Sequence, residues 1–473
     1  MTYVTEGRQP EKALRFFEEL CAIPRPSGGE AKVADWLCEF AKARGLECHR
    51  DELGDVVIKR PGKGDALMLQ GHTDMVSAVA PEKGVSDAIA YLAEHGVKPI
   101  LDGDLLHADG TTLGADNGVA VAMMLAILDT PELKTPPLEC VFTVQEETGL
   151  FGAKAVDGSL ISARRMINLD SEKDGMLTVS CAGGCRIAIE REFSVSEVGE
   201  CALRLDVSGL LGGHSGEQIH LPRENAIHLC ARVAGLLRIG GRLAWIRGGE
   251  ADNAIPRSCS ALIVYSSAER MANAKNRFAE LAFDYPHEPE LKITLHDAKP
   301  EPALADGEDL FEMLAALPNG VQARDEQNGF VLTSLNCGVI STDGGKLRAT
   351  LSLRSSVAEN MVKLKETVIA AAEKFGFKAI VGAEYPGWAF REVSPLRDTL
   401  MSAWKRVTGE EMKVQSIHAG LECGLFSAKL DGLDAVALGP TIHDCHTPQE
   451  SLDLRSLERT WRTLVAALEM LAK

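Results

Sequence analysis

Hydrophobic and polar residues alternate along the chain in patterns that predict both helices and strands. Apolar positions recur at helical spacing over 10–20 and 30–44, and the continuous apolar run 119–128 predicts a buried helix. Short apolar runs predict strands at 56–58, 66–69, 141–144 and 166–170. Strands and helices that alternate in this way indicate an α/β domain, with a mixed, mostly parallel sheet flanked by helices.

The pattern changes between about residues 185 and 387. There the predicted elements follow a β-α-β-β-α order that occurs roughly twice, and the segment 261–269 resembles 350–359. This weak internal repeat predicts a separate α+β domain with two similar halves.

Beyond this region the first pattern returns, with helices predicted at 395–407 and 452–471. A chain of 473 residues is also too long for one ordinary core. We therefore expect one domain built from residues 1–184 and 388–473, with residues 185–387 inserted into it as a second domain.

Composition and charge exclude several classes of protein. Hydrophobic residues make up 45% of the chain and charged residues 25%, which is typical of a folded globular protein. Fifty basic residues against 68 acidic ones give a net charge of −18, which argues against nucleic acid or an anionic membrane as partner. The apolar run 119–128 is well short of the roughly 20 residues that span a bilayer.

The expected location is the cytoplasm. The first twelve residues carry charge and no apolar core, so no secretory signal is expected there. The 12 cysteines are scattered and form no Cys-x-x-Cys pair, which indicates reduced thiols rather than a disulfide framework or a thiolate zinc cluster.

Polar side chains that could carry chemistry follow three of the predicted strands. One strand runs into Glu146 and Glu147, neighbouring carboxylates that repel each other unless a cation lies between them or one keeps its proton. Another leads to His72 and Asp74, which point the same way because they are two apart in an extended segment. His72 could then bind a metal while Asp74 holds its other ring nitrogen. A third strand ends in Asp170.

Each of these groups also has an ordinary explanation. The two glutamates could lie in a solvated turn, and His72 could be a hydrogen-bonded histidine at a sheet edge. Asp116 and Asn117 stand near the predicted start of the helix 119–128, where a capping role is common. A metal ligand at Asp116 would instead explain the glycines on both sides of this pair, which leave the carboxylate reachable.

Taken together, the groups could hold two metal ions. Mixed imidazole and carboxylate donors favour zinc or a similar first-row ion, with cobalt or manganese as substitutes, rather than magnesium or calcium. Two ions that share a carboxylate polarise a carbonyl and make hydroxide available near neutral pH. One acid must then stay unligated to accept the proton of the water.

The set of motifs resembles a known family, the dinuclear-zinc exopeptidases and amidohydrolases, which includes aminoacylases, acetylornithine deacetylase, carnosinase and bacterial dipeptidases. The matching segments are Gly71-His72-Thr73-Asp74, Gly114-Ala115-Asp116-Asn117-Gly118, Glu146-Glu147-Thr148-Gly149, Asn168-Leu169-Asp170, Gly212-Gly213-His214-Ser215-Gly216 and His446. Within the family, segments 23–28, 71–76 and 168–172 look most like those of bacterial aminoacyl-histidine dipeptidases. A loop-rich segment, 76–110, that ends in a predicted hairpin at 101–107 separates the first two motifs without removing a ligand.

The resemblance implies a role for each residue of the expected centre. Asp116 would bridge two ions, with His72 and Asp170 on one of them and Glu147 and His446 on the other. Glu146 would be the general base, and Asp74 the carboxylate behind His72. The sequence alone does not decide between the two adjacent glutamates, and the family order, with the base first, decides it here. His443 competes with His446, which alone fits the family spacing after Gly-Pro and before a glutamate.

The resemblance also implies that the inserted domain is a lid that carries substrate contacts. His214 would polarise the scissile carbonyl as an oxyanion develops, and Asn253 and Arg354 match positions that touch the substrate. A guanidinium fork suits a free α-carboxylate. Without the resemblance, His214 reads as a loop histidine and Arg354 as half of a surface ion pair on a lid strand.

The expected activity is hydrolysis of dipeptides with a free C-terminal carboxylate, Xaa-His and β-alanyl-histidine included, by a homodimer. One alternative is a deacylase of N-acyl amino acids. Another is a metal-binding scaffold without turnover, which is disfavoured because pure binding does not require Glu146 and Asp74. A nicotinamide enzyme is disfavoured because no Gly-x-Gly-x-x-Gly follows a strand.

Overall fold

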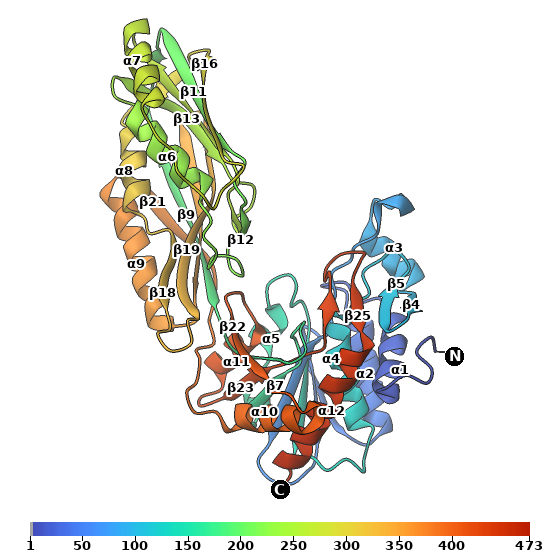
Figure 1. The fold of residues 1–473 in the computed structure, drawn as a ribbon. Coiled ribbons are helices and arrows are strands. Elements are labelled where there is room, and N and C mark those ends of the chain that lie inside the picture. Colours follow the sequence, from blue (N-terminus) through green and yellow to red (C-terminus); the bar gives the residue numbers. More distant parts are fainter. Residues whose placement is uncertain (1–2) are drawn as a thin grey trace. The chain divides into compact units, whose positions relative to one another are not determined.

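Two large β-sheets are the framework of the protein in the computed structural model, which describes residues 3–473 (Figure 1). Each sheet belongs to its own compact unit. The first unit comprises Met1–Ser180, Trp388–Ser416 and Leu421–Lys473, and the second Cys181–Gly387 and Ile417–Gly420. No pattern in the sequence indicates that the short segment Ile417–Gly420 groups with the second unit.

An eight-stranded mixed sheet forms the centre of the first unit. In order across the sheet, its strands are β1 (Glu47–Arg50), β2 (Val56–Arg60), β6 (Leu138–Thr143), β3 (Leu67–His72), β7 (Arg165–Asn168), β23 (Asp434–Ala437), β8 (Met176–Cys181) and β22 (Lys413–Ile417). The middle strands β6, β3, β7 and β23 are parallel, and antiparallel pairs flank them. Because parallel strands end at the same edge, the residues that follow β3, β6 and β7 come together there.

Helices cover both faces of this sheet. The helices of this unit are α1 (Glu11–Cys21), α2 (Ala31–Ala43), α3 (Ala88–His95), α4 (Ala115–Leu128), α5 (Phe151–Ala155), α10 (Pro395–Thr408), α11 (Glu422–Lys429) and α12 (Leu454–Leu471), with short 3-10 turns η1 (Pro81–Lys83) and η2 (Gly158–Leu160), and α3 lies away from the sheet (Figure 1). A Cβ built on Gly71 of β3 would lie 2.6 Å from the Ala120 Cβ of α4. The neighbouring Gln70 donates a hydrogen bond to Glu422 of α11 instead. Since adjacent strand residues point to opposite faces, α4 and α11 lie on opposite sides of β3.

The segment 76–110 contains more regular structure than its loop-rich sequence predicts. Asp87 caps α3 by accepting a hydrogen bond from the Ala90 backbone at 3.0 Å, but only Leu92 of that helix is buried. A helix with so little buried surface has no apolar stripe for a sequence pattern to detect. The expected hairpin is β4 (Pro99–Asp102) with β5 (Leu105–Ala108), and it joins β25 (Ser451–Asp453) and β24 (Ile442–His443) in a small sheet.

A nine-stranded antiparallel sheet forms the second unit. In order it contains β16 (Lys292–Ala298), β11 (Cys201–Ser208), β15 (Cys259–Tyr265), β13 (Gly241–Gly248), β19 (Val331–Asp343), β20 (Lys346–Ser355), β9 (Gly183–Glu192) and β21 (Lys378–Tyr385), and β18 (Gly320–Arg324) pairs with β19. Two short ladders accompany it, β10 (Val195–Val198) with β17 (Pro302–Leu304) and β12 (Gly213–His214) with β14 (Ala254–Ile255).

The helices of the second unit pack along its sheet on one side (Figure 1). They are α6 (Ala226–Leu237), α7 (Ala268–Ala279), α8 (Glu308–Ala316) and α9 (Ala358–Lys374). Both segments of the weak repeat run from a strand into a helix, from β15 into α7 and from β20 into α9. In the part of the chain that is described, no helix has the length and hydrophobicity that a membrane crossing requires.

Candidate metal centre

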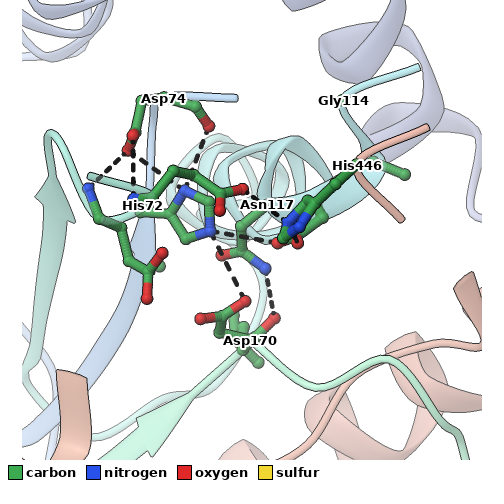
Figure 2. A network of polar contacts seen from close by, with 12 residues as sticks. His72, Asp74, Gly114, Asn117, Asp170 and His446 are labelled. Carbon is green, nitrogen blue, oxygen red and sulfur yellow. Dashed lines mark hydrogen bonds and ion pairs between the residues drawn. The ribbon is translucent and has the colours of Figure 1, made fainter. Parts of the chain in front are cut away.

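The carboxyl-end edge of the first sheet carries a dense group of acids and imidazoles. His72 is the last residue of β3, Glu146 and Glu147 follow β6, and Asp170 follows β7. Figure 2 shows the His72 side chain between Asp74 and Asp170, with His446 nearby. Residues from distant parts of one unit therefore converge at this edge, as their positions after parallel strands predict.

Two groups of three side chains, each with one histidine, share the carboxylate of Asp116. Its Oδ1 lies 3.1 Å from Nε2 of His72, and its Oδ2 lies 3.1 Å from Nε2 of His446. Asp170 Oδ1 completes the first group at 3.7 Å from His72 Nε2. Glu147 Oε1 completes the second at 3.0 Å from His446 Nε2. In each group the possible ligand atoms all lie within 4.8 Å of one another.

The arrangement around His72 fits a cation. Its Nδ1 lies 3.1 Å from the Asp74 carbonyl oxygen and 3.3 Å from Asp74 Oδ1, so the ring hydrogen of a neutral imidazole belongs on Nδ1. The lone pair of Nε2 then points at oxygens of Asp116 and Asp170, which is repulsive unless a positive charge lies among them. The mixed donor set suits zinc or a similar ion.

The pKa values of the histidines and acids in the centre reflect the close approach of several carboxylates. Burial alone would lower the pKa of His72, but the Asp170 and Asp116 carboxylates outweigh it and hold this pKa well above its ordinary value. Hydrogen bonds to Asp116 and Glu147 raise the pKa of His446 to about 11. Burial and the neighbouring acids raise the pKa of Asp170. Bound cations would relieve this repulsion.

Asp74 connects the strand that ends in His72 to the turn that carries the two glutamates. Its carboxylate is fully buried and accepts hydrogen bonds from Ser27 Oγ at 2.7 Å and from the backbone N–H groups of Glu146 and Glu147 at 3.0 and 3.2 Å. Burial is the main cause that raises the pKa of Glu146 to about 8, and its carboxylate also lies within 4.8 Å of ligand atoms of His72 and Glu147.

Asp116 does not cap the helix whose start it occupies. The N-cap position of α4 is Gly114, and Asp116 and Asn117 depart from helical geometry. The carboxylate of Glu450 takes the capping role, since it accepts hydrogen bonds from the N–H groups of residues 113, 114, 115 and 116 at 2.8, 2.9, 2.7 and 3.3 Å. Asn117 instead donates to the Leu169 carbonyl at 3.0 Å. The Asp116 side chain is thus left for the centre.

Two residues close to His446 in sequence, His443 and Cys445, are not part of the group that His446 forms with Asp116 and Glu147. His443 is exposed on β24 and lies outside every group of possible ligands found among the described residues. Cys445 lies within 4.8 Å of Asp116 and Glu172, a grouping that sequence reasoning missed. Burial raises the pKa of the Cys445 thiol, and Glu172 and Asp116 add to the effect.

A second cluster lies in the second unit, around Gly216. A Cβ built on this glycine would lie 3.0 Å from His214 Cε1 and 3.2 Å from Arg354 Cζ, and would also meet the His418 carbonyl. Arg354 is buried, whereas Asn253 is exposed, and the carbonyl oxygen of Asn253 accepts a hydrogen bond from the Ser215 backbone N–H at 2.8 Å. The structure therefore brings His214 and Arg354 together.

His418 is a member of this cluster that sequence reasoning did not single out. Its Nε2 lies 2.8 Å from Ser334 Oγ. Burial, with the nearby Arg354 guanidinium, lowers the pKa of His418 to about 3 and also lowers the pKa of His214. The only sequence signal was its position in a turn that precedes Glu422.

Comparison with known proteins agrees with this chemistry. The model of peptidase family M20/M25/M40 matches residues 68–470. The cytosol non-specific dipeptidase of Escherichia coli (strain K12) is 32% identical over 97% of this chain and 97% of its own length. The crystal structure of aminoacylhistidine dipeptidase from Vibrio alginolyticus has a TM-score of 0.90 and 30% identity, over 99% of this chain and 98% of that chain.

A more distant structure shares the fold alone. The tripeptidase from Staphylococcus aureus subsp. aureus Mu50 has a TM-score of 0.57 and 18% identity over 98% of this chain and 99% of that chain. The family match confirms the resemblance inferred from the motifs and the expected α/β class. Since the matched residues cover most of its length, the chain belongs to peptidase family M20/M25/M40, a family of metal-dependent peptidases.

Proposed function

We propose that this metallopeptidase hydrolyses dipeptides with a free C-terminal carboxylate, Xaa-His dipeptides such as β-alanyl-histidine included. The observation that carries the proposal is the pair of imidazole–carboxylate groups that share Asp116. Similarity to two dipeptidases over nearly the whole chain supports it. The Vibrio relative is named for aminoacylhistidine substrates and the Escherichia coli relative as non-specific, so the preference for histidine has to be measured separately.

Two divalent cations are the proposed cofactors, zinc first, with cobalt or manganese as substitutes. His72 and Asp170 would hold one ion, Glu147 and His446 the other, and Asp116 both. When bound, such a pair polarises a carbonyl oxygen and makes hydroxide available near neutral pH. The mixture of imidazole and carboxylate donors supports zinc.

Glu146 is the proposed general base. It would accept the proton of the attacking water and pass it to the amine of the leaving residue. A carboxyl group whose pKa lies near neutrality suits this double task, and burial moves Glu146 in that direction. Asp74 would keep the ring hydrogen of His72 on Nδ1, which leaves the Nε2 lone pair for the metal.

His214 and Arg354 are the proposed substrate-binding groups, together with Asn253. The backbone N–H of Glu217 donates to Nδ1 of His214 at 3.1 Å, so the hydrogen of the neutral ring lies on Nε2. That N–H could donate to the oxyanion that forms from the scissile carbonyl. The Arg354 guanidinium would bind the α-carboxylate. The second unit acts as a lid in this proposal.

The proposed setting is a homodimer in the cytoplasm. The Escherichia coli relative is named a cytosol dipeptidase, and the family resemblance stated above implies a dimer. Light scattering on the purified protein, with the mass of one chain at 50.9 kDa, distinguishes a monomer from a dimer directly.

A substrate panel tests the proposed activity. The zinc-loaded protein is assayed on β-alanyl-histidine, other Xaa-His dipeptides, dipeptides without histidine, their C-terminal amides and N-acetyl amino acids. We expect turnover of free dipeptides, and a KM that rises about 10- to 100-fold for the amides because the pairing with Arg354 is lost. Turnover of N-acetyl amino acids alone would instead show a deacylase. Equal rates on all dipeptides would remove the histidine preference but leave the dipeptidase intact.

A further inference from the structure

Arg25 is a buried cation beside the metal centre, in the segment 23–28 whose purpose the sequence did not reveal. Only 1% of its surface is exposed. Its Nη1 donates to the carbonyl oxygens of Thr73 and Asp74 at 3.0 and 3.1 Å, and its Nη2 donates to the carbonyl oxygen of Gly114. Burial of a guanidinium costs free energy, so a buried arginine here needs a reason beyond packing.

The three carbonyl groups belong to the two backbone segments that carry ligands. Thr73 and Asp74 directly follow His72 at the end of β3, whereas Gly114 lies two residues before Asp116. One rigid guanidinium therefore spans the gap between the segment of His72 and the segment of Asp116. A planar fork with fixed donor directions determines that spacing more tightly than a flexible ammonium group could.

The glycines on both sides of Asp116 make room for this guanidinium. A Cβ built on Gly118 would lie 2.6 Å from Nη2 of Arg25 and 3.1 Å from Phe17, and a Cβ on Gly114 would also meet Nη2. Gly114 has a φ of 70° and needs glycine for that reason as well. Gly118 has no such backbone requirement, so its contact with Arg25 gives a direct reason for glycine at this position.

Glu450 holds the same loop from its other side. Its carboxylate, 2% exposed, accepts the N–H groups of residues 113–116, while Arg25 binds the carbonyl oxygen of Gly114. Glu450 lies four residues after His446. The loop that presents Asp116 is thus fixed between the segment of one proposed ligand, His72, and the segment of the other, His446.

We propose that Arg25 is a positioning residue of the metal centre, whose guanidinium sets the spacing between the Asp116 carboxylate and the His72 imidazole and so the affinity for the ion they share. The two polar side chains of segment 23–28, Arg25 and Ser27, would then both position groups of the metal centre. Ser27 orients Asp74 through a hydrogen bond of 2.7 Å, and Arg25 fixes the backbone on both sides. This inference rests on the metal centre of the proposed function.

The test compares Arg25 with a second buried arginine that has no ligand segment to position. Arg60 is 9% exposed, and its guanidinium also donates to three backbone carbonyls, those of Ile127, Pro131 and Leu133 at 2.5, 3.4 and 2.7 Å. These carbonyls lie at and beyond the opposite end of α4. The variants Arg25→Lys, Arg25→Met and Arg60→Met are stripped of metal, and their zinc affinity is measured by competition with a chromophoric chelator alongside Tm.

We expect both Arg25 variants to bind the zinc ion that His72 and Asp116 would share about 10- to 100-fold less tightly than the wild type, since loss of a residue that orients ligands typically has this effect. Arg25→Lys keeps the charge, so its weakened binding would isolate the fork geometry. Arg60→Met should lower Tm and leave zinc affinity within about twofold of wild type, because its carbonyl partners carry no ligand.

Gly118→Ala tests the same contact without removing the arginine. Its added methyl group should weaken zinc binding in the wild-type background and have a smaller effect in Arg25→Met, where the guanidinium is gone. This variant decides the matter if the Arg25 variants do not fold. Wild-type zinc affinity in folded Arg25→Lys or Gly118→Ala, or an equal loss in Arg60→Met, would overturn the inference. A wild-type protein that binds no zinc would instead overturn the proposed function.

Discussion

Histidines in the two units of this protein lie in opposite electrostatic environments. In the first unit, the carboxylates of Asp116, Asp170 and Glu147 surround His72 and His446 and raise the pKa of both rings. In the second unit, burial and the guanidinium of Arg354 lower the pKa of His214 and His418. The histidine side chain thus has a raised pKa in one cluster and a lowered pKa in the other.

The contrast explains which kind of ligand each cluster suits. Imidazoles that face several carboxylates attract positive charge, and a divalent cation satisfies both kinds of donor at once. Imidazoles held neutral beside an arginine remain N–H donors, and together with that arginine they suit an anionic group. A dipeptide offers both features, a scissile carbonyl that needs polarisation and a free carboxylate that needs a cationic partner.

The largest effect is expected from Glu146→Gln, in the metal centre of the first unit. We expect kcat to fall about 100- to 10,000-fold because the proposed general base is lost. The two bound ions should remain, since Glu146 is not a proposed ligand. Glu147→Gln is the matched control and should lose metal as well as activity. Activity within tenfold of wild type in Glu146→Gln would remove the distinction between the two neighbouring acids.

Arg354→Met removes the positive charge from the second cluster. We expect KM for dipeptides to rise about 10- to 100-fold because a charge-assisted hydrogen bond to the substrate carboxylate is lost. C-terminally amidated dipeptides, which lack this carboxylate, should be affected little by the same change. An equal rise in KM for free and amidated dipeptides would show that Arg354 does not recognise the carboxylate.

The lowered pKa of His418 predicts a pH-dependent stability. The folded protein keeps this ring neutral down to about pH 3, whereas the unfolded chain binds a proton below about 6.5. The free energy of unfolding should therefore fall as the pH drops from 6.5 towards 3, by at most about 1.4 kcal/mol for each pH unit from this one group.

Thermal unfolding between pH 6.5 and pH 5 checks this prediction. His418→Asn should lose less Tm over the interval than the wild type, because its side chain takes up no proton in the unfolded chain. His296→Asn, a change at an exposed histidine of the same unit, serves as the control. Identical pH slopes for His418→Asn and the wild type would contradict the assigned environment.

The smallest effect is expected from His443→Ala. This side chain is exposed and lies outside the groups of possible ligands, so metal content and kcat/KM should stay within about twofold of wild type. His446→Ala, three residues further along, should lose the ion that it shares with Glu147. Loss of metal in His443→Ala, with metal retained in His446→Ala, would show that His443 is the ligand instead of His446.

Much of the fold and of the acidic cluster could be predicted from the sequence because the signals are local. Short apolar runs that lead into His72, Glu146 or Asp170 predict a meeting point at one sheet edge once the strands are taken as parallel. The inserted α+β region was also visible as a change of pattern. Helix α3 was not predicted, since it buries only Leu92.

The supporting residues could not be predicted because their partners are remote in sequence. Glu450 accepts a hydrogen bond from Ala115, 335 residues away, a contact that nothing in its local sequence indicates. Arg25 reads as a loop residue between two prolines, yet its guanidinium binds Gly114, 89 residues away. His418 lies far along the chain from Ser334, its partner in the second unit.

Counting the divalent ions bound per chain tests the central idea most directly. Elemental analysis is made on the wild type and on Asp116→Asn after both are loaded with zinc and dialysed against the same weak chelator. A carboxylate shared by two imidazole groups predicts two ions in the wild type and the loss of both in the variant. A wild type with no bound zinc, or an Asp116→Asn variant that still retains two ions, would contradict it.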